Sequence, residues 1–170
     1  MEMLIVLTLA VMPALTIVAG LKDMTSMTIP NWISAALVIG FFPAALAVGL
    51  PIMSILTHVG VGVAALLAAI LLFALRIFGG GDAKLMAATC LWMGLAGTLP
   101  FVLWTAVMGG VLGLVLILTR RHAQPLLPGA PGWVGTLLAP KGAIPYGIAI
   151  AAGALIAYPA SPLVVTFLAR

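Results

Sequence analysis

Long apolar runs separated by short charged connections form the main pattern of this chain. A helix that crosses a membrane needs about 20 mostly apolar residues, because the hydrocarbon layer is about 30 Å thick and each residue adds 1.5 Å. Such runs without a formal charge cover residues 3–20, 32–50, 55–75, 85–118 and 144–168. We predict that all of them are helical, since a backbone amide in lipid has to be bonded within its own segment.

The run 85–118 is too long for one crossing. Gly97-Thr98-Leu99-Pro100 lies inside it, and there a glycine permits a turn while a proline cannot continue a helix. We therefore expect two crossings in this run, and an all-α polytopic membrane protein with six transmembrane helices. No internal repeat or polar low-complexity segment divides residues 1–170, so a single membrane domain is expected.

Basic residues follow the odd-numbered predicted crossings. They are Lys22 after the first crossing, Arg76 and Lys84 after the third, and Arg120, Arg121 and Lys141 after the fifth. Since cytoplasmic loops carry an excess of Lys and Arg, this side is predicted to be cytoplasmic and both termini extracytoplasmic. The proline-rich connection 119–143 is too broken for a crossing and too apolar for a free loop. We expect it to lie at the membrane surface.

Composition narrows the classes of protein that remain. The chain has 170 residues, 65% of them apolar and 6% charged, whereas a soluble domain is about a quarter charged. A soluble globule, a disordered tail and a nucleic-acid-binding domain are excluded, because the net charge of +4 comes from scattered bases. The single Cys90 excludes a disulfide framework and a cysteine zinc site, and no metal or cofactor is expected. A signal peptide begins with basic residues, whereas this chain has Glu2 at its start. We therefore expect that the first helix is not cleaved off.

Two carboxylates are the main candidates for chemistry. Asp23 follows the first predicted crossing and Asp82 precedes the fourth, so the topology places both at the cytoplasmic face. Two carboxylates a few ångströms apart do not both ionise easily and share a proton. One can then take a proton from water while the other polarises a carbonyl group. Peptide hydrolysis by an aspartic protease requires this combination.

The residues around each aspartate suggest how a site is shaped. Gly79, Gly80 and Gly81 precede Asp82, allow unusual backbone angles and leave room for an extended peptide. We expect these glycines to be mobile in the free protein. Pro30 can open the second helix, and Asn31 can offer polar contacts at its start.

Two further side chains on the same predicted face have open roles. Lys84 serves either as a topology anchor at the membrane surface or as a substrate-binding group. Tyr146 either lines the site or supports the helix that begins beside Pro145.

Three segments together resemble the type IV prepilin peptidases. They are Asp23 with Ile29-Pro30-Asn31 after five intervening residues, Gly79-Gly80-Gly81-Asp82-Ala83-Lys84-Leu85, and Ile144-Pro145-Tyr146-Gly147-Ile148-Ala149. The resemblance implies a GxGD-type intramembrane aspartic protease with Asp23 and Asp82 as its catalytic pair. It also implies a multi-pass protein in the cytoplasmic (inner) membrane of a prokaryote.

The resemblance further implies a substrate and a subtype. The substrate would be a prepilin with a basic leader and an apolar helix, cut at the cytoplasmic face beside membrane lipid, with no nucleic acid involved. Paired CxxC motifs and the room for them before Asp23 are missing, so the chain is similar to the short form without an N-methyltransferase or zinc region. That form resembles the CpaA and TadV proteins of Flp/Tad pilus assembly.

Two other functions remain open. The aspartates could carry protons or cations in a small transporter, although transporter sites usually lie near the membrane midplane. Alternatively, the chain could be a non-enzymatic subunit of a pilus or secretion assembly. In that case Asp82 would only cap a helix, a position that aspartate favours.

Overall fold

The computed structural model describes residues 2–123 and 129–170, and all regular elements in that part are helices, as predicted. In chain order they are α1 (Glu2–Ser26), α2 (Asn31–Val48), α3 (Ile52–Ala74), α4 (Gly80–Ala123), α5 (Gly132–Leu137), α6 (Tyr146–Ala157), the 3₁₀ turn η2 (Tyr158–Ala160) and α7 (Pro162–Leu168). Within these described ranges, five segments are long and apolar enough to cross a membrane: α1, α2, α3, α4 as far as His122, and Tyr146–Leu168.

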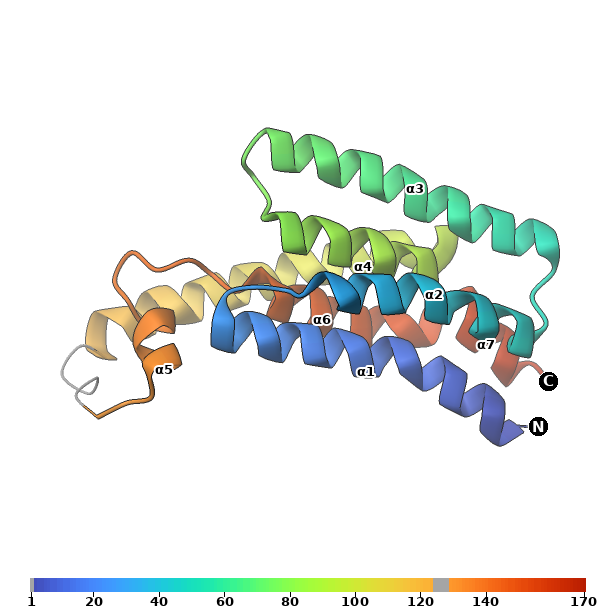
Figure 1. Cartoon of the computed structure of the whole chain (residues 1–170), viewed down its shortest axis with the longest axis horizontal. Helices are drawn as coiled ribbons and strands as arrows, with labels where there is room; N and C mark the ends of the chain where they lie inside the picture. The colour runs from blue at the N-terminus through green and yellow to red at the C-terminus, as the bar shows by residue number, and fades with distance from the viewer. Residues whose placement is uncertain (1, 124–128) are drawn as a thin grey trace.

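The long helices lie alongside one another in a bundle (Figure 1). α4 packs against α3 and α6, and α1 packs against α6 and α2. Both termini lie at one end of the bundle, whereas the α1–α2 and α3–α4 connections lie at the other (Figure 1). Asp23, near the end of α1, and Asp82, near the start of α4, are therefore at the same end.

The long helix α4 reverses its direction at Gly94. This residue has φ 59° and ψ −170°, a conformation that is open essentially only to glycine. Continuous helix between residues 82 and 109 would separate them by about 40 Å. Instead, Tyr146 contacts Gly109 and interacts electrostatically with Asp82. The segments 80–93 and 95–123 therefore lie antiparallel, as the ribbon shows (Figure 1).

The reversal lies three residues before the predicted break. Pro100 is inside the helix that follows it, so the prediction of a break at residues 97–100 was wrong in position. Packing against α3 explains the choice of Gly94. The buried ring of His58 fills the place of a Gly94 side chain, where a Cβ atom would lie 2.6 Å from Cε1. His58 Nδ1 also lies 2.7 Å from the carbonyl oxygen of Leu91, in the last turn before the reversal.

Two other segments differ from their predicted form. Residues 144–168 do not form one continuous helix, because η2 and Ser161 separate α6 from α7, and the Ser161 hydroxyl accepts a hydrogen bond from Val164 N–H. The connection 119–143 begins as helix, since α4 continues to Ala123, and it contains the short helix α5. Pro125 and Pro128, which were expected to break this connection, lie outside the described residues.

Two aromatic side chains in the largely aliphatic interior, Trp92 and Tyr158, have hydrogen-bonded polar groups. Trp92 lies between Phe41 and Tyr158, with ring centroids 5.9 and 6.4 Å away. Its indole N–H donates to the carbonyl oxygen of Leu37, and the Tyr158 hydroxyl donates to that of Leu9. These bonds remove the cost of burying polar groups in an apolar layer.

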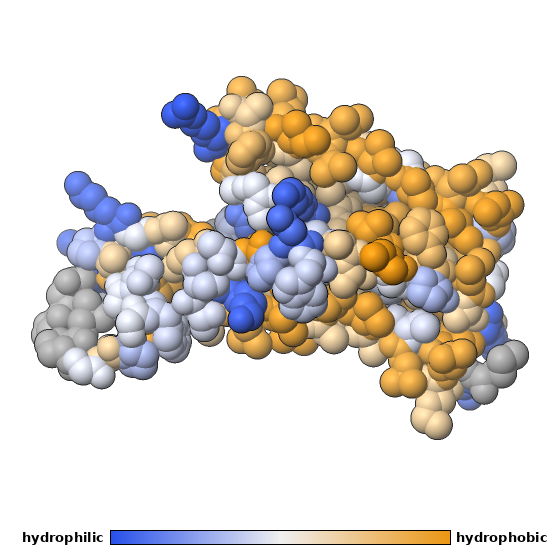
Figure 2. Space-filling model, viewed as in Figure 1, coloured by the Kyte–Doolittle hydropathy of each residue, from blue (hydrophilic) through white to orange (hydrophobic). Residues whose placement is uncertain are grey.

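The surface has the opposite character from a soluble protein. Large apolar side chains are exposed along the length of the bundle, whereas hydrophilic residues gather toward the end with α5 and at the α3–α4 connection (Figure 2). Hydrophilic residues also lie near the termini at the opposite end (Figure 2). An apolar belt with polar residues beyond it is expected of a bundle surrounded by lipid.

Candidate active site

Asp23 is held in place by the first turn of α6. Its side chain is only 6% exposed, and its Oδ2 accepts a hydrogen bond of 2.7 Å from the backbone N–H of Gly147. Gly147 is the second residue of α6, where a backbone N–H has no partner within the helix. The positive end of the α6 dipole also faces the carboxylate. Asp23 thus satisfies a free helix N–H from a segment 124 positions away.

Glycine at position 147 makes this contact possible. A Cβ atom there would lie 2.9 Å from both Cβ and Oδ2 of Asp23, and 3.0 Å from Cδ1 of Ile29. These distances are shorter than any normal contact of a side chain. The absence of a side chain at Gly147 therefore allows α1 and α6 to meet at the carboxylate.

Asp82 is the third residue of α4 and is partly buried. Its carboxylate bonds to the backbone of Gly79, the residue before the helix. A side chain at the third helical position that reaches back to the residue before the helix is a known way to cap a helix start. The capping role that the sequence left open for Asp82 is thus present, and it does not exclude a chemical one.

The two aspartates are brought together although 59 positions separate them. Ile29 lies between their segments, because a Cβ atom on Gly81 would lie 3.1 Å from Cβ of Ile29, which also packs against Gly147. The residue that precedes Pro30 therefore sets the spacing between the two halves of the site.

Tyr146 packs near the start of α4. This half-buried residue has its ring 5.8 Å from that of Phe78, which lies four residues before Asp82. The other edge of the ring rests on Gly109 in the returning half of α4. Tyr146 thus lines the candidate site and also packs against its support.

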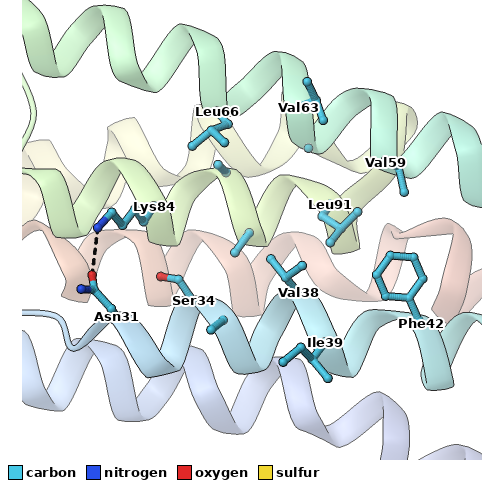
Figure 3. A pocket seen from close by; sticks show the side chains of 14 residues that line it. Asn31, Ser34, Val38, Ile39, Phe42, Val59, Val63, Leu66, Lys84 and Leu91 are labelled. Atoms are coloured by element: carbon cyan, nitrogen blue, oxygen red, sulfur yellow. Dashed lines mark hydrogen bonds between the residues drawn. The ribbon is translucent and has the colours of Figure 1, made fainter.

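Lys84 and Asn31 lie on another side of α4 and contact each other. Lys84 Nζ donates to Asn31 Oδ1 over 3.0 Å, at one end of an apolar groove of about 500 Å³ between α2, α3 and α4 (Figure 3). Pro30, with φ −62° and ψ 137°, precedes the first residue of α2 and sets its direction. In the described residues these two polar side chains bind each other, so the structure does not join them to the aspartate pair.

Three contributors to the site were not among the predicted site residues: Gly147, Ile29 and Phe78. Gly147 and Ile29 belong to the segments that carried the resemblance, but nothing in the sequence indicated that they contact each other. A glycine in the first turn of a helix, two residues after Pro145, was the one signal that a close approach occurs there.

The comparisons with known proteins give a family for the chain. A sequence model described as "Type IV leader peptidase family" matches residues 10–114. No curated protein and no solved structure matches the chain. The matched range includes both aspartates, the Ile29-Pro30-Asn31 segment and the three glycines, and it covers more than half of the chain. The chain is therefore a membrane-helix protein that belongs to the type IV leader peptidase family.

Proposed function

We propose that this peptidase is an aspartic endopeptidase in which Asp23 and Asp82 form the catalytic pair. The observation that carries the proposal is the convergence of two acidic side chains from distant segments at one end of the bundle. There Ile29 packs against both Gly81, the neighbour of Asp82, and Gly147, which donates to Asp23. The sequence holds only one other acid, Glu2, near the start of α1 and at the end of the bundle with the termini. The chain therefore offers one acidic pair for general acid–base work.

The proposed reaction is addition of water to the scissile peptide bond. The ionised aspartate removes a proton from water, and the oxygen attacks the carbonyl carbon while the protonated aspartate donates its proton to the carbonyl oxygen. When the tetrahedral intermediate collapses, the C–N bond breaks, the leaving amine takes the proton that the first aspartate had removed from water, and the second aspartate regains a proton from a hydroxyl group of the intermediate. The Gly147 N–H fixes Asp23, and the glycines beside Asp82 leave the backbone accessible to an extended peptide.

The proposed topology has six crossings. The segments 80–93 and 95–123 would form the fourth and fifth passes, because the reversal at Gly94 makes them antiparallel. The first has 14 residues and a length of about 21 Å, so the reversal would lie inside the hydrocarbon layer, where α3 packs against Gly94. The basic residues after the odd-numbered crossings favour a cytoplasmic position for the aspartate end, with both termini outside. Membership of the leader peptidase family supports the inner membrane of a prokaryote as the location.

The proposed substrate is a prepilin of the Flp/Tad type, with a basic leader followed by an apolar helix. Both the family and the position of the aspartates at a bundle end support this substrate. A peptide bond between a soluble leader and a membrane helix lies at the interface, where the aspartates would meet it. Much of the affinity would come from burial of the apolar helix.

The test is co-expression of a candidate prepilin with Asp23→Asn or Asp82→Asn, followed by mass spectrometry of the product. Each change keeps the size of the side chain and removes its acid–base function, so cleavage should fall about 1,000-fold or more. Glu2→Gln is the matched control and should cleave normally.

Normal processing by either aspartate variant would overturn the proposal. If Asp82→Asn cleaved normally, the remaining role of Asp82 would be its capping contact with Gly79. Such a role is expected in a non-enzymatic assembly subunit.

A further inference from the structure

Arg120 is partly buried, and its guanidinium group donates hydrogen bonds to one segment of backbone, residues 137–143. Its Nε and Nη2 donate to the carbonyl oxygen of Leu137 at 2.9 and 2.8 Å, Nη1 donates to that of Gly142 at 2.8 Å, and Nη2 also donates to that of Ala143 at 2.7 Å. A guanidinium group has a rigid fork of donors that suits such multiple contacts. Four hydrogen bonds are more than a topology anchor in the surface layer requires.

The segment held by Arg120 leads directly into α6. Ala143 is followed by Ile144, the buried Pro145, Tyr146 and Gly147. Proline restricts the backbone of this short stretch, so the position of Ala143 constrains the start of the helix. The N–H of Gly147, which binds Asp23, is only four residues beyond the Ala143 carbonyl oxygen that Arg120 holds.

A stripe on the returning half of α4 sets the register of this segment. Gly109, Gly113 and Arg120 are spaced by four and seven residues, which places them on one face of a helix. Tyr146 packs on Gly109, and Cδ1 of Ile144 would lie 3.6 Å from a Cβ atom on Gly113. The segment 142–146 therefore follows the stripe in the opposite direction, with Arg120 at its start and Tyr146 at its end.

We propose that Arg120 is a positioning residue for the peptidase reaction: it fixes the segment 142–146 on α4 and so holds the Gly147 N–H against Asp23. This inference rests on the proposed function of Asp23. Arg120 acts through the backbone and contacts neither aspartate in the described structure. Loss of its hydrogen bonds would let the start of α6 shift, and a shift of about 1 Å at a catalytic group is enough to slow a reaction strongly.

The test compares Arg120→Lys and Arg120→Ala with Arg121→Ala, a neighbouring exposed base of the same charge. Lysine keeps the charge but cannot reproduce the fork of donors. We expect kcat for prepilin cleavage to fall about 10-fold or more in both Arg120 variants with KM nearly unchanged, and no change in Arg121→Ala. Hydrogen exchange at the Gly147 amide should become faster in both Arg120 variants and stay the same in Arg121→Ala.

The two readouts separate this inference from the proposed function. If wild-type protein cleaves and Asp23→Asn does not, the catalytic pair stands. In that case, wild-type cleavage and wild-type exchange in Arg120→Lys would overturn the positioning role alone and leave Arg120 as a charge anchor. If wild-type protein does not cleave any prepilin, the proposed function fails. Unchanged exchange at Gly147 would then still refute the contact between Arg120 and the α6 start.

Discussion

The two aspartate segments are built in different ways. Asp23 lies near the end of a 25-residue helix, is buried, and bonds to a helix start 124 positions away. Asp82 lies in the first turn of its helix, is only partly buried, and bonds to Gly79 in its own connection. Tertiary packing holds the first carboxylate, whereas local backbone holds the second. We infer that Asp23 is the fixed member of the pair and Asp82 the adjustable one.

This difference suits an enzyme that has to admit a peptide. A site in which both acids were rigid would have to be open before the substrate arrives. With one adjustable acid, the pair can reach its working separation after the peptide is bound. The inference can be tested by disturbing each aspartate segment in turn.

The largest effect is expected at the fixed side, in Gly147→Ala. The added methyl group would lie 2.9 Å from Asp23 and 3.0 Å from Ile29, with packed helices on both sides. Neither neighbour can withdraw easily, so Asp23 should be displaced and kcat should fall about 100-fold. Gly113→Ala is the control, because its Cβ atom would make an ordinary contact of 3.6 Å. A loss smaller than about threefold would show that Asp23 is not fixed as described.

A smaller effect is expected at the adjustable side, in Gly79→Ala. Its methyl group would lie 2.9 Å from Oδ2 of Asp82, the far end of a side chain that can rotate away. We expect cleavage to fall about 10-fold, measured as kcat. Gly80→Ala is the comparison, since its nearest contact would be 3.5 Å from the Phe73 ring. It removes the backbone freedom of one glycine without a clash, so its loss of activity should be smaller than that of Gly79→Ala. Equal losses in the two variants would point to loop stiffness as the cause, not to a contact with Asp82.

The smallest effect is a difference in backbone motion. Amides of residues 79–82 should exchange hydrogen about 10-fold faster than those of residues 31–33, which also form the first turn of a helix. The two turns lack the same helical bonds, but only the first contains consecutive glycines. Exchange at residues 79–82 should slow when a substrate peptide binds. Slow exchange there in the free protein would contradict the adjustable role of Asp82.

The amino-acid sequence by itself determined the class of the protein and the end of the bundle at which its two aspartates lie. Apolar runs and the charges between them can be identified from residues that are close together in the chain. Because burying a charge in lipid is costly, these two features determine which segments enter the membrane. For the same reason, Asp23 and Asp82 could be placed at one end of the bundle before any packing was known. Composition alone excluded a soluble fold.

Only the tertiary structure decided how the site is assembled. Gly94 and Gly97 are equivalent as local signals, and the packing of His58 from α3 selected Gly94 as the point of reversal. The hydrogen bond between Asp23 and Gly147 and the contacts of Arg120 with residues 137–143 join segments that no local pattern connects. Such contacts depend on which helix faces come together. The hydrophobic runs indicate the length of each helix but not its rotation about its own axis, because packing against the other helices sets that rotation.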